Sequence, residues 1–167
     1  MIGDEPTLTR ERLREILDYD PETGTFTHKS RPRVKKGSRA GYVKKRGYRE
    51  MMIDRHTYRE HRLAWLWMTG EWPTELIDHK DANRQNNAWD NLREATSFQN
   101  AQNTPRKVWT KSGLKGACYC KQTGKWRSMI RVNGKQLDLG RHATPEKAHL
   151  AYAAAAIEYF GEFARLT

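Results

Sequence analysis

Residues 75–103 restrict the fold more than any other part of the sequence, because they are dense in polar side chains that follow one short apolar run. That run ends at Asp78 and His79, a loop rich in asparagine follows, and a second strand is expected at 92–95. Segments of this length suit strands and are too short for buried helices. A threonine and a serine come next and can cap a helix that extends to Asn103. We therefore predict a strand, a loop, a second strand and a helix within this segment.

The residues before this segment predict a mixed α and β region. Thr9 can cap a first helix, whose apolar positions Leu13, Ile16 and Leu17 have helical spacing and which ends before Pro21. A short strand is expected at 25–27, then a basic loop, then three strands between residues 42 and 58. A second helix is expected over about 59–69, with Gly70 just after its end.

The residues after the segment predict a separate unit. Residues 105–112 contain turn-forming and charged residues without periodicity and are interpreted as a linker. Three strands are expected at 114–120, 125–132 and 135–141, and a helix opens at Thr144-Pro145-Glu146. That helix is expected to bury one face, formed by Ala148, Tyr152, Ala155 and Tyr159. The predicted class is α+β.

Charge is distributed in blocks along the chain. The net charge is +11, and residues 29–62 hold 13 Lys and Arg against 3 acidic residues, while residues 107–167 hold 11 against 4. Basic blocks of this kind favour a polyanionic partner, most often nucleic acid. The alternative is a solvated, lysine-rich surface without a partner.

Composition argues against membrane and secreted proteins. Hydrophobic residues make up 37% of the chain, mean hydropathy is −0.98, and no apolar run approaches the roughly 20 residues of a membrane helix. The N-terminus lacks the basic start and apolar stretch of a secretory signal. Cys118 and Cys120 form no disulfide framework or zinc motif. A cytoplasmic protein is expected, with no membrane partner.

The side chains around Asp78 and His79 are suited to hydrolysis. Asp78 and the amide oxygen of Asn100 could hold a hard cation such as Mg²⁺, and His79 could act as a general base near neutral pH. Metal-assisted cleavage of a phosphodiester would use these groups. The alternative remains that Asp-His pairs are common and that asparagine clusters mostly build turns.

A resemblance to a known family favours metal-assisted hydrolysis over a turn-forming asparagine cluster. The segment DHKDANRQNNAWDNLREATSFQNAQN resembles the HNH endonuclease motif of the phage and intron homing subgroup, and residues 61–73 and the N-terminal helix resemble that subgroup too. The matching positions are Asp78, His79, Asn86, Asn87, Asn91, Leu92, Arg93, Gln99, Asn100 and Asn103.

The resemblance implies a role for each matched position. His79 would be the general base, Asn91 would hold the loop and keep His79 oriented, and Asp78 with Asn100 would bind the metal. An asparagine at the last position implies Mg²⁺ or Mn²⁺ rather than Zn²⁺. The implied nuclease domain spans residues 1–104, with a ββα-metal core at about 74–104. A phage-infected bacterium is the implied setting.

The C-terminal block, residues 113–167, resembles the ethylene-response-factor (Apetala-two) DNA-binding domain through its GLKG, GKWRSMIRV and LGRHATPEKAHLAYAAAA elements. That family lays a three-stranded antiparallel sheet, packed on one helix, into DNA. Alternation along the second strand predicts Arg127 and Arg131 on the exposed face, whereas the alternative is a sheet with solvated arginines. The candidate DNA-binding residues are Lys35, Lys36, Arg39, Lys44, Lys45, Lys115, Lys125, Arg127, Arg131 and Gln136.

The sequence thus predicts a metal-dependent DNA endonuclease that acts on double-stranded DNA as a monomer or weak dimer. The alternative is a non-catalytic DNA-binding regulator with a vestigial nuclease domain, and an RNA-binding accessory protein is disfavoured. His61 lies outside the motif: it could contact a phosphate, or it could be a structural histidine at the junction of helix and sheet.

Overall fold

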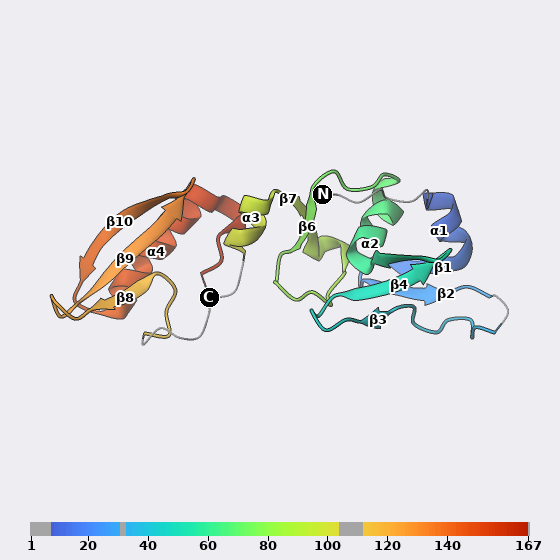
Figure 1. Ribbon diagram of the computed structural model, residues 1–167, viewed down its shortest axis with the longest axis horizontal. Helices are drawn as coiled ribbons and strands as arrows, with labels where there is room; N and C mark the ends of the chain where they lie inside the picture. Colours follow the sequence, from blue (N-terminus) through green and yellow to red (C-terminus); the bar gives the residue numbers. More distant parts are fainter. Residues whose placement is uncertain (1–7, 31–32, 104–111, 167) are drawn as a thin grey trace. The chain divides into compact units, whose positions relative to one another are not determined.

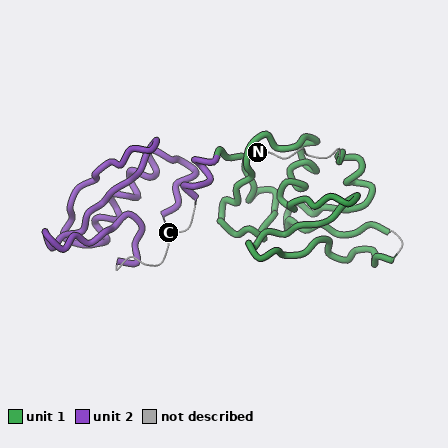
Figure 2. The backbone as a smooth tube through the Cα atoms, in the orientation of Figure 1, with its two compact units in different colours: residues 1–96 green, residues 97–167 purple. Residues whose placement is uncertain are grey.

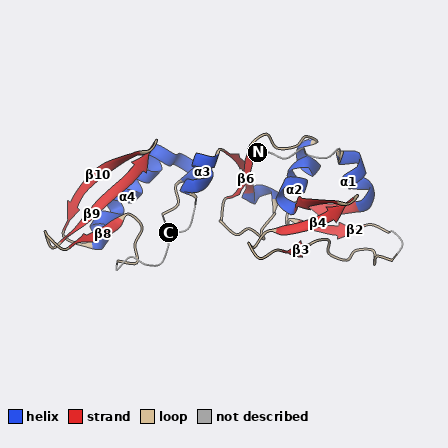
Figure 3. Ribbon diagram, in the orientation of Figure 1, coloured by secondary structure: helices blue, strands red, loops and turns tan. Residues whose placement is uncertain are grey.

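A computed structural model describes residues 8–30, 33–103 and 112–166. The chain divides into two compact units, Met1–Thr96 and Ser97–Thr167, shown in green and purple in Figure 2. The predicted linker at 105–112 lies outside the described residues except for Ser112, and the predicted domain boundaries stay a prediction. Helices and small antiparallel sheets occur in both units (Figure 3), which confirms the α+β class. In the described residues no helix is long and apolar enough to span a membrane.

Unit 1 combines two helices with three small sheets (Figure 1). Its sheets are β1–β2, β3–β4–β5 and β6–β7, and all of their pairings are antiparallel. The elements of unit 1, in order, are α1 (Arg10–Ile16), β1 (Leu17–Asp20), β2 (Thr25–His28), β3 (Tyr42–Val43), β4 (Arg49–Ile53), β5 (His56–Arg59), α2 (Glu60–Thr69), β6 (Leu76–His79), the 3-10 turn η1 (Trp89–Asn91) and β7 (Leu92–Ala95).

The hydrophobic core of unit 1 lies between helix α2 and the sheets. Leu13, Phe26 and Leu63 are fully buried in it, and Trp65 and Trp72 pack against its edge. Gly70 ends α2 in the left-handed conformation, as the sequence predicts. The core therefore holds the first turn of α2 against the sheets, and this turn contains Glu60 and His61 of the candidate site.

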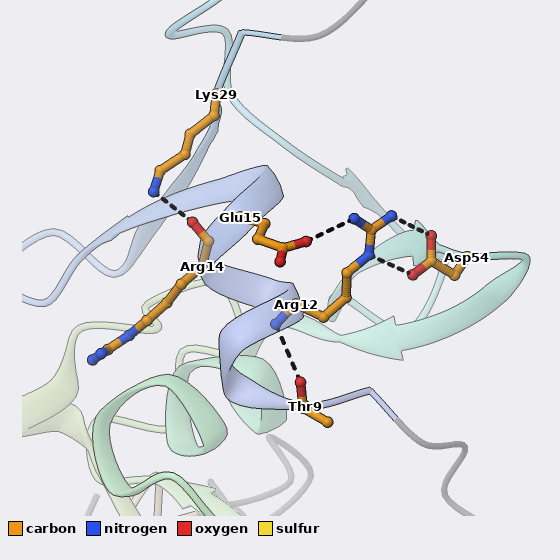
Figure 4. A network of polar contacts seen from close by, with 6 residues as sticks. All are labelled: Thr9, Arg12, Arg14, Glu15, Lys29 and Asp54. Atoms are coloured by element: carbon orange, nitrogen blue, oxygen red, sulfur yellow. Dashed lines mark hydrogen bonds and ion pairs between the residues drawn. The ribbon is translucent and has the colours of Figure 1, made fainter.

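Helix α1 is shorter than predicted. It ends at Ile16, and Leu17–Asp20 is a strand whose burial alternates with every residue. The prediction of Leu17 as a helical position is therefore wrong, because pairing with β2 buries Leu17 and Tyr19 on one side of the hairpin. Polar contacts tie α1 to the β4–β5 turn: Arg12 contacts both Glu15 and Asp54, and Thr9 accepts from the Arg12 amide (Figure 4).

Unit 2 is a three-stranded antiparallel sheet, in the order β10–β9–β8, packed on one long helix. The first predicted strand starts later than expected, because Gly116 has a φ of +79° and lies against the ring of Tyr152, where a Cβ would come within 2.1 Å of ring carbon Cγ. The elements of unit 2 are α3 (Ser97–Gln102), β8 (Ala117–Cys120), β9 (Lys125–Val132), β10 (Lys135–His142), α4 (Pro145–Phe160) and the 3-10 turn η2 (Gly161–Phe163).

The buried face of α4 differs from the prediction at one position. Ala148, Tyr152, Ala155 and Phe160 are buried, whereas Tyr159 is 47% exposed. Tyr159 is one residue before Phe160, and one residue turns the side chain by about 100° around the helix, away from the sheet. The expectation that Tyr159 belongs to this face is therefore wrong.

Candidate active site

The β6–β7 hairpin of unit 1 holds the Asp78-His79 pair. Asp78 lies opposite Arg93 and His79 opposite Leu92 in the antiparallel register, and both Asp78 and His79 are buried. Neighbouring strand residues point to opposite faces of a sheet, so the carboxylate and the imidazole have different surroundings. The imidazole contacts Asn87 in the β6–β7 loop, and the carboxylate pairs with Arg93 on β7.

The imidazole of His79 is oriented by a buried asparagine. Nε2 of His79 lies 3.0 Å from Oδ1 of Asn87, and Nδ2 of Asn87 donates to Oε2 of Glu60 at 2.8 Å. Because the amide hydrogens of Asn87 are directed to a carboxylate, its oxygen faces the imidazole and accepts the Nε2 hydrogen. The lone pair of His79 is then on Nδ1. Burial lowers the pKa of His79, so the ring is neutral at neutral pH.

The carboxylate that binds Asn87 belongs to a buried ion pair. Glu60, in the first turn of α2, is fully buried, and its Oε2 lies 3.0 Å from Nε of Arg49 on β4. Burial raises the pKa of Glu60, while the charge of Arg49 acts in the opposite direction. Arg49 also donates to the carbonyl oxygens of Ala40 and Gly41, each at 3.1 Å. A chain of polar contacts thus runs from the β3–β4 sheet to His79.

The N-terminal hairpin supports the backbone of Asn87. The hydroxyl of Tyr19 donates to the Asn87 carbonyl at 2.7 Å, and the amide of Trp89 donates to the carbonyl of Pro21 at 2.8 Å. Gly24 lies so close that a Cβ there would come within 2.1 Å of the amide nitrogen of Ala88. The hairpin therefore holds the loop that positions Asn87.

Asn91 contacts the loop rather than the imidazole in the hydrogen bonds of the described structure. Its Oδ1 accepts from the Asp81 amide at 3.0 Å, and its Nδ2 donates to Oδ1 of Asp81 at 3.0 Å and to the Asn86 carbonyl at 2.8 Å. These bonds close the loop between β6 and β7. The role that the sequence analysis gave to Asn91 is thus divided: Asn91 holds the loop, and Asn87 contacts His79.

Asp78 is paired with a cation on the neighbouring strand. Its Oδ2 accepts from Nε and Nη2 of Arg93 at 3.0 and 2.9 Å, and both side chains are largely buried. Asn100, the other predicted metal ligand, lies on α3 and is therefore in unit 2. Among the described residues, no group of three His, Cys, Asp or Glu side chains could hold a metal.

His61, on helix α2, packs against His79. Its ring is 5.1 Å from that of His79 between centroids, at 83°, and the residue is only 3% exposed. Burial lowers the pKa of His61 well below its ordinary value, and the nearby charges of Arg59 and Arg62 act in the same direction. Of the two readings of His61, the structure favours the buried histidine at the junction of helix and sheet.

The predicted DNA-binding residues differ in their surroundings. Those of unit 1 are all exposed, as are Lys125, Arg131 and Gln136 of unit 2. Arg127 instead forms an ion pair with Asp138 at 2.8 Å, and Lys115 donates to the carbonyl of Arg165 at 2.9 Å. Burial lowers the pKa of Lys115. The unit 1 residues in this group are Lys35, Lys36, Arg39, Lys44 and Lys45.

Sequence reasoning missed Glu60 and Tyr19 as parts of the site. Glu60 opens a helix, where an acidic residue ordinarily stabilises the N-terminus from the surface, and Tyr19 has the pattern of a core aromatic. Asn87 was among the motif positions but received no role. A contact between residues 27 positions apart, such as that of Asn87 with Glu60, leaves no periodic signal in a sequence.

The chain is similar to several known proteins. A family model described as HNH endonuclease matches residues 58–102. Protein 3.8 of Escherichia phage T7 is 34% identical over 108 residues, covering 64% of this chain and 88% of that protein. The uncharacterized HNH endonuclease L560 of Acanthamoeba polyphaga mimivirus is 34% identical over 125 residues, covering 74% of this chain and 64% of that protein.

A solved structure of DNA binding and cleavage by the HNH homing endonuclease I-HmuI also matches. The TM-score is 0.41 with 20% sequence identity, and the match covers 87% of this chain and 78% of that chain.

Proposed function

This chain belongs to the HNH endonuclease family, and from that premise we propose that it is a metal-dependent DNA endonuclease of the homing type in which His79 activates the attacking water. The observation that carries the proposal is the buried contact of His79 with Asn87. It holds a neutral imidazole with its lone pair on Nδ1, which is the state that a general base needs.

The proposed reaction is hydrolysis of one phosphodiester bond. Nδ1 of His79 takes a proton from water, the water oxygen forms a bond to phosphorus, and the bond from phosphorus to the 3′ oxygen breaks. The 3′ oxygen leaves and takes a proton from solvent, to which His79 later releases the proton it removed, so the products are a 5′-phosphate and a 3′-hydroxyl. The positive charge that develops on His79 is stabilised by the Asn87 oxygen, which accepts the Nε2 hydrogen throughout.

We propose that Asp78 and Asn100, the pair that the resemblance implies, would hold a hard divalent cation. Asp78 offers a carboxylate and Asn100 an amide oxygen, and Mg²⁺ or Mn²⁺ usually takes one or two such protein ligands together with water and substrate phosphates. When bound, the cation would stabilise negative charge on the phosphate and on the departing oxygen. Arg93 pairs with Oδ2 of Asp78, so a cation bound there would compete with the guanidinium and would be held weakly by protein groups alone.

Unit 2 is proposed to bind the DNA target, and double-stranded DNA is the proposed substrate. Its three-stranded sheet on one helix is the arrangement implied by the resemblance to the Apetala-two module, and its exposed Lys125, Arg131 and Gln136 could contact phosphates and base edges. The exposed basic residues of unit 1 would hold the DNA backbone near the site. We propose that the protein acts as a monomer or weak dimer in the cytoplasm of a phage-infected bacterium.

Cleavage of the genome that encodes this chain tests the proposal. Purified full-length protein is incubated with that DNA in supercoiled form, with Mg²⁺ or with EDTA, and cleavage positions are mapped on both strands. We expect nicked or linear product only with Mg²⁺, and loss of product in His79→Ala with DNA affinity within a few-fold of wild type. If His79→Ala cleaves at the wild-type rate, His79 is not the base. If the wild type binds but never cleaves, the chain is a DNA-binding regulator.

A further inference from the structure

Tyr48 lies beside the two buried histidines of the site. Its ring centroid is 5.3 Å from that of His61 and 6.2 Å from that of His79. Tyr48 is half-buried and directly follows the β3–β4 turn, whose residues Lys44 and Lys45 are exposed. The tyrosine therefore connects the basic turn with the imidazole that is proposed to act as base.

Two arginines from different parts of unit 1 lie over the Tyr48 ring. The guanidinium carbon of Arg59, at the end of β5, is 4.9 Å from the ring centroid, and that of Arg84, in the β6–β7 loop, is 4.8 Å from it. Nη1 of Arg84 also donates to the carbonyl of Arg46 at 2.8 Å. The loop that carries Asn87 and Asn91 is thereby fixed to the basic turn.

The charge of these two arginines is not balanced by a salt bridge. Both residues are exposed, and within the described ranges neither forms an ion pair with a carboxylate. The adjacent His61 and His79 are buried and offer no negative charge. Each guanidinium is attracted to the ring, but the two positive charges repel each other, so a bound anion would stabilise the arrangement. A guanidinium binds phosphate oxygens through two parallel N–H groups, and an aromatic ring restricts its orientation.

We propose that Arg59 and Arg84, held over Tyr48, bind the phosphate backbone of the DNA strand next to the bond whose hydrolysis His79 assists. This proposal rests on the proposed function. The three side chains come from β5, from the residue before β4 and from the β6–β7 loop, so a phosphate bound there would join the basic turn to the hairpin of His79. Each guanidinium would donate to non-bridging oxygens of that backbone.

Arg14 provides a matched control in the same unit. It is exposed, lies on α1 (Figure 4), and its guanidinium carbon is 5.1 Å from the Trp67 ring centroid, with Nη2 donating to the Trp67 carbonyl at 3.3 Å. Arg14→Ala therefore removes the same charge and the same kind of ring contact as Arg84→Ala. Tyr48 and the histidines are untouched by that change.

Binding is measured first, in full-length protein carrying His79→Ala, as the affinity for a DNA duplex over a range of salt concentrations. We expect Arg59→Ala and Arg84→Ala each to weaken binding several-fold and to reduce the slope of log affinity against log salt by about one. Arg14→Ala is expected to leave the slope unchanged. Arg84→Lys, which keeps the charge, should keep the slope and thereby separate a phosphate contact from loss of folding.

Cleavage is measured second, in single-turnover reactions without the His79 change. Arg84→Ala is expected to reduce the rate at least tenfold, and Arg14→Ala less than twofold. The proposal is overturned if Arg59→Ala and Arg84→Ala match Arg14→Ala in both the salt slope and the rate. If the wild type does not cleave and the slopes still change as expected, the phosphate contact stands and the hydrolytic function fails.

Discussion

His79 and Asn87 meet in a buried hydrogen bond of 3.0 Å, with the imidazole Nε2 directed to the amide oxygen. They are eight positions apart. Asn91 donates to the Asn86 carbonyl in the loop between them, and Tyr19 of the N-terminal hairpin donates to the Asn87 carbonyl. The orientation of the proposed base is thus set by residues outside its own strand. That dependence makes the site testable without changing the base itself.

Asn87→Ala should reduce cleavage while leaving DNA binding intact. The change removes the acceptor of the Nε2 hydrogen, so the ring can rotate or change tautomer, and we expect the single-turnover rate to fall by about 10²-fold, within the usual range for general-base catalysis. Asn83→Ala is the matched control, because Asn83 is an exposed asparagine of the same loop whose side chain accepts from the Gln85 amide rather than contacting His79. Equal rates for the two variants would show that Asn87 does not orient the base.

Removal of the cation should stop cleavage without releasing DNA. EDTA is expected to abolish product, and Asn100→Ala is expected to raise the Mg²⁺ concentration needed for half of the maximal rate, because one of two protein oxygen ligands is lost. The measurement is a titration of single-turnover rate against Mg²⁺. Gln102→Ala, on the same helix and outside the motif positions, is the control. A titration curve that Asn100→Ala does not shift would remove Asn100 from the metal site.

Glu60→Ala should destabilise the protein strongly. It leaves Arg49 and the Asn87 amide without their buried partner, and breaking such a pair costs about 3–5 kcal/mol. Glu50→Ala is the control, since its pairing with Lys44 is 4.0 Å long and partly exposed, a type that contributes about 0–1 kcal/mol. Urea unfolding gives both free energies, and similar values would mean that the ion pair of Glu60 contributes little.

The free energy of unfolding should fall in mild acid because His61 is buried as a neutral ring. Its pKa is lowered in the folded state by burial and by His79, Arg59 and Arg62. In the unfolded chain it binds a proton below about pH 6.5, so stability is unaffected above that pH and decreases by up to about 1.4 kcal/mol per pH unit below it. His61→Phe should weaken this dependence, measured by urea unfolding at pH 5–8. His56→Phe, at an exposed position, should not.

Asp138 should limit the contribution of Arg127 to DNA binding. The two form an exposed ion pair on the sheet of unit 2, so Arg127→Ala is expected to weaken binding less than Arg131→Ala. Loss of an arginine that contacts a base costs about 1–3 kcal/mol. Asp138→Asn should increase affinity, because it frees Arg127 and removes a negative charge. Unchanged affinity in all three variants, across a salt titration, would place this sheet outside the DNA interface.

Local sequence patterns predicted most of the elements. The strand at 92–95, the strand at 125–132, the cap of Thr144 and the end of α2 at Gly70 depend on alternation, capping and backbone conformation within a few residues. Leu17 and Tyr159 were predicted wrongly for one reason. Their apolar character fits a helical face, but the hairpin partner in one case and the position of the sheet in the other determine which way each points.

The amino-acid sequence was enough to predict the polar β6–β7 segment, its resemblance to the HNH motif, the basic blocks and the α+β class. The folded structure was needed to show which asparagine contacts His79, that Glu60 binds this asparagine and pairs with Arg49, and that two arginines contact the ring of Tyr48. A motif specifies side-chain chemistry along one segment only. Burial and hydrogen bonding join α2, β4 and the N-terminal hairpin to that segment, and they arise only when the chain is folded.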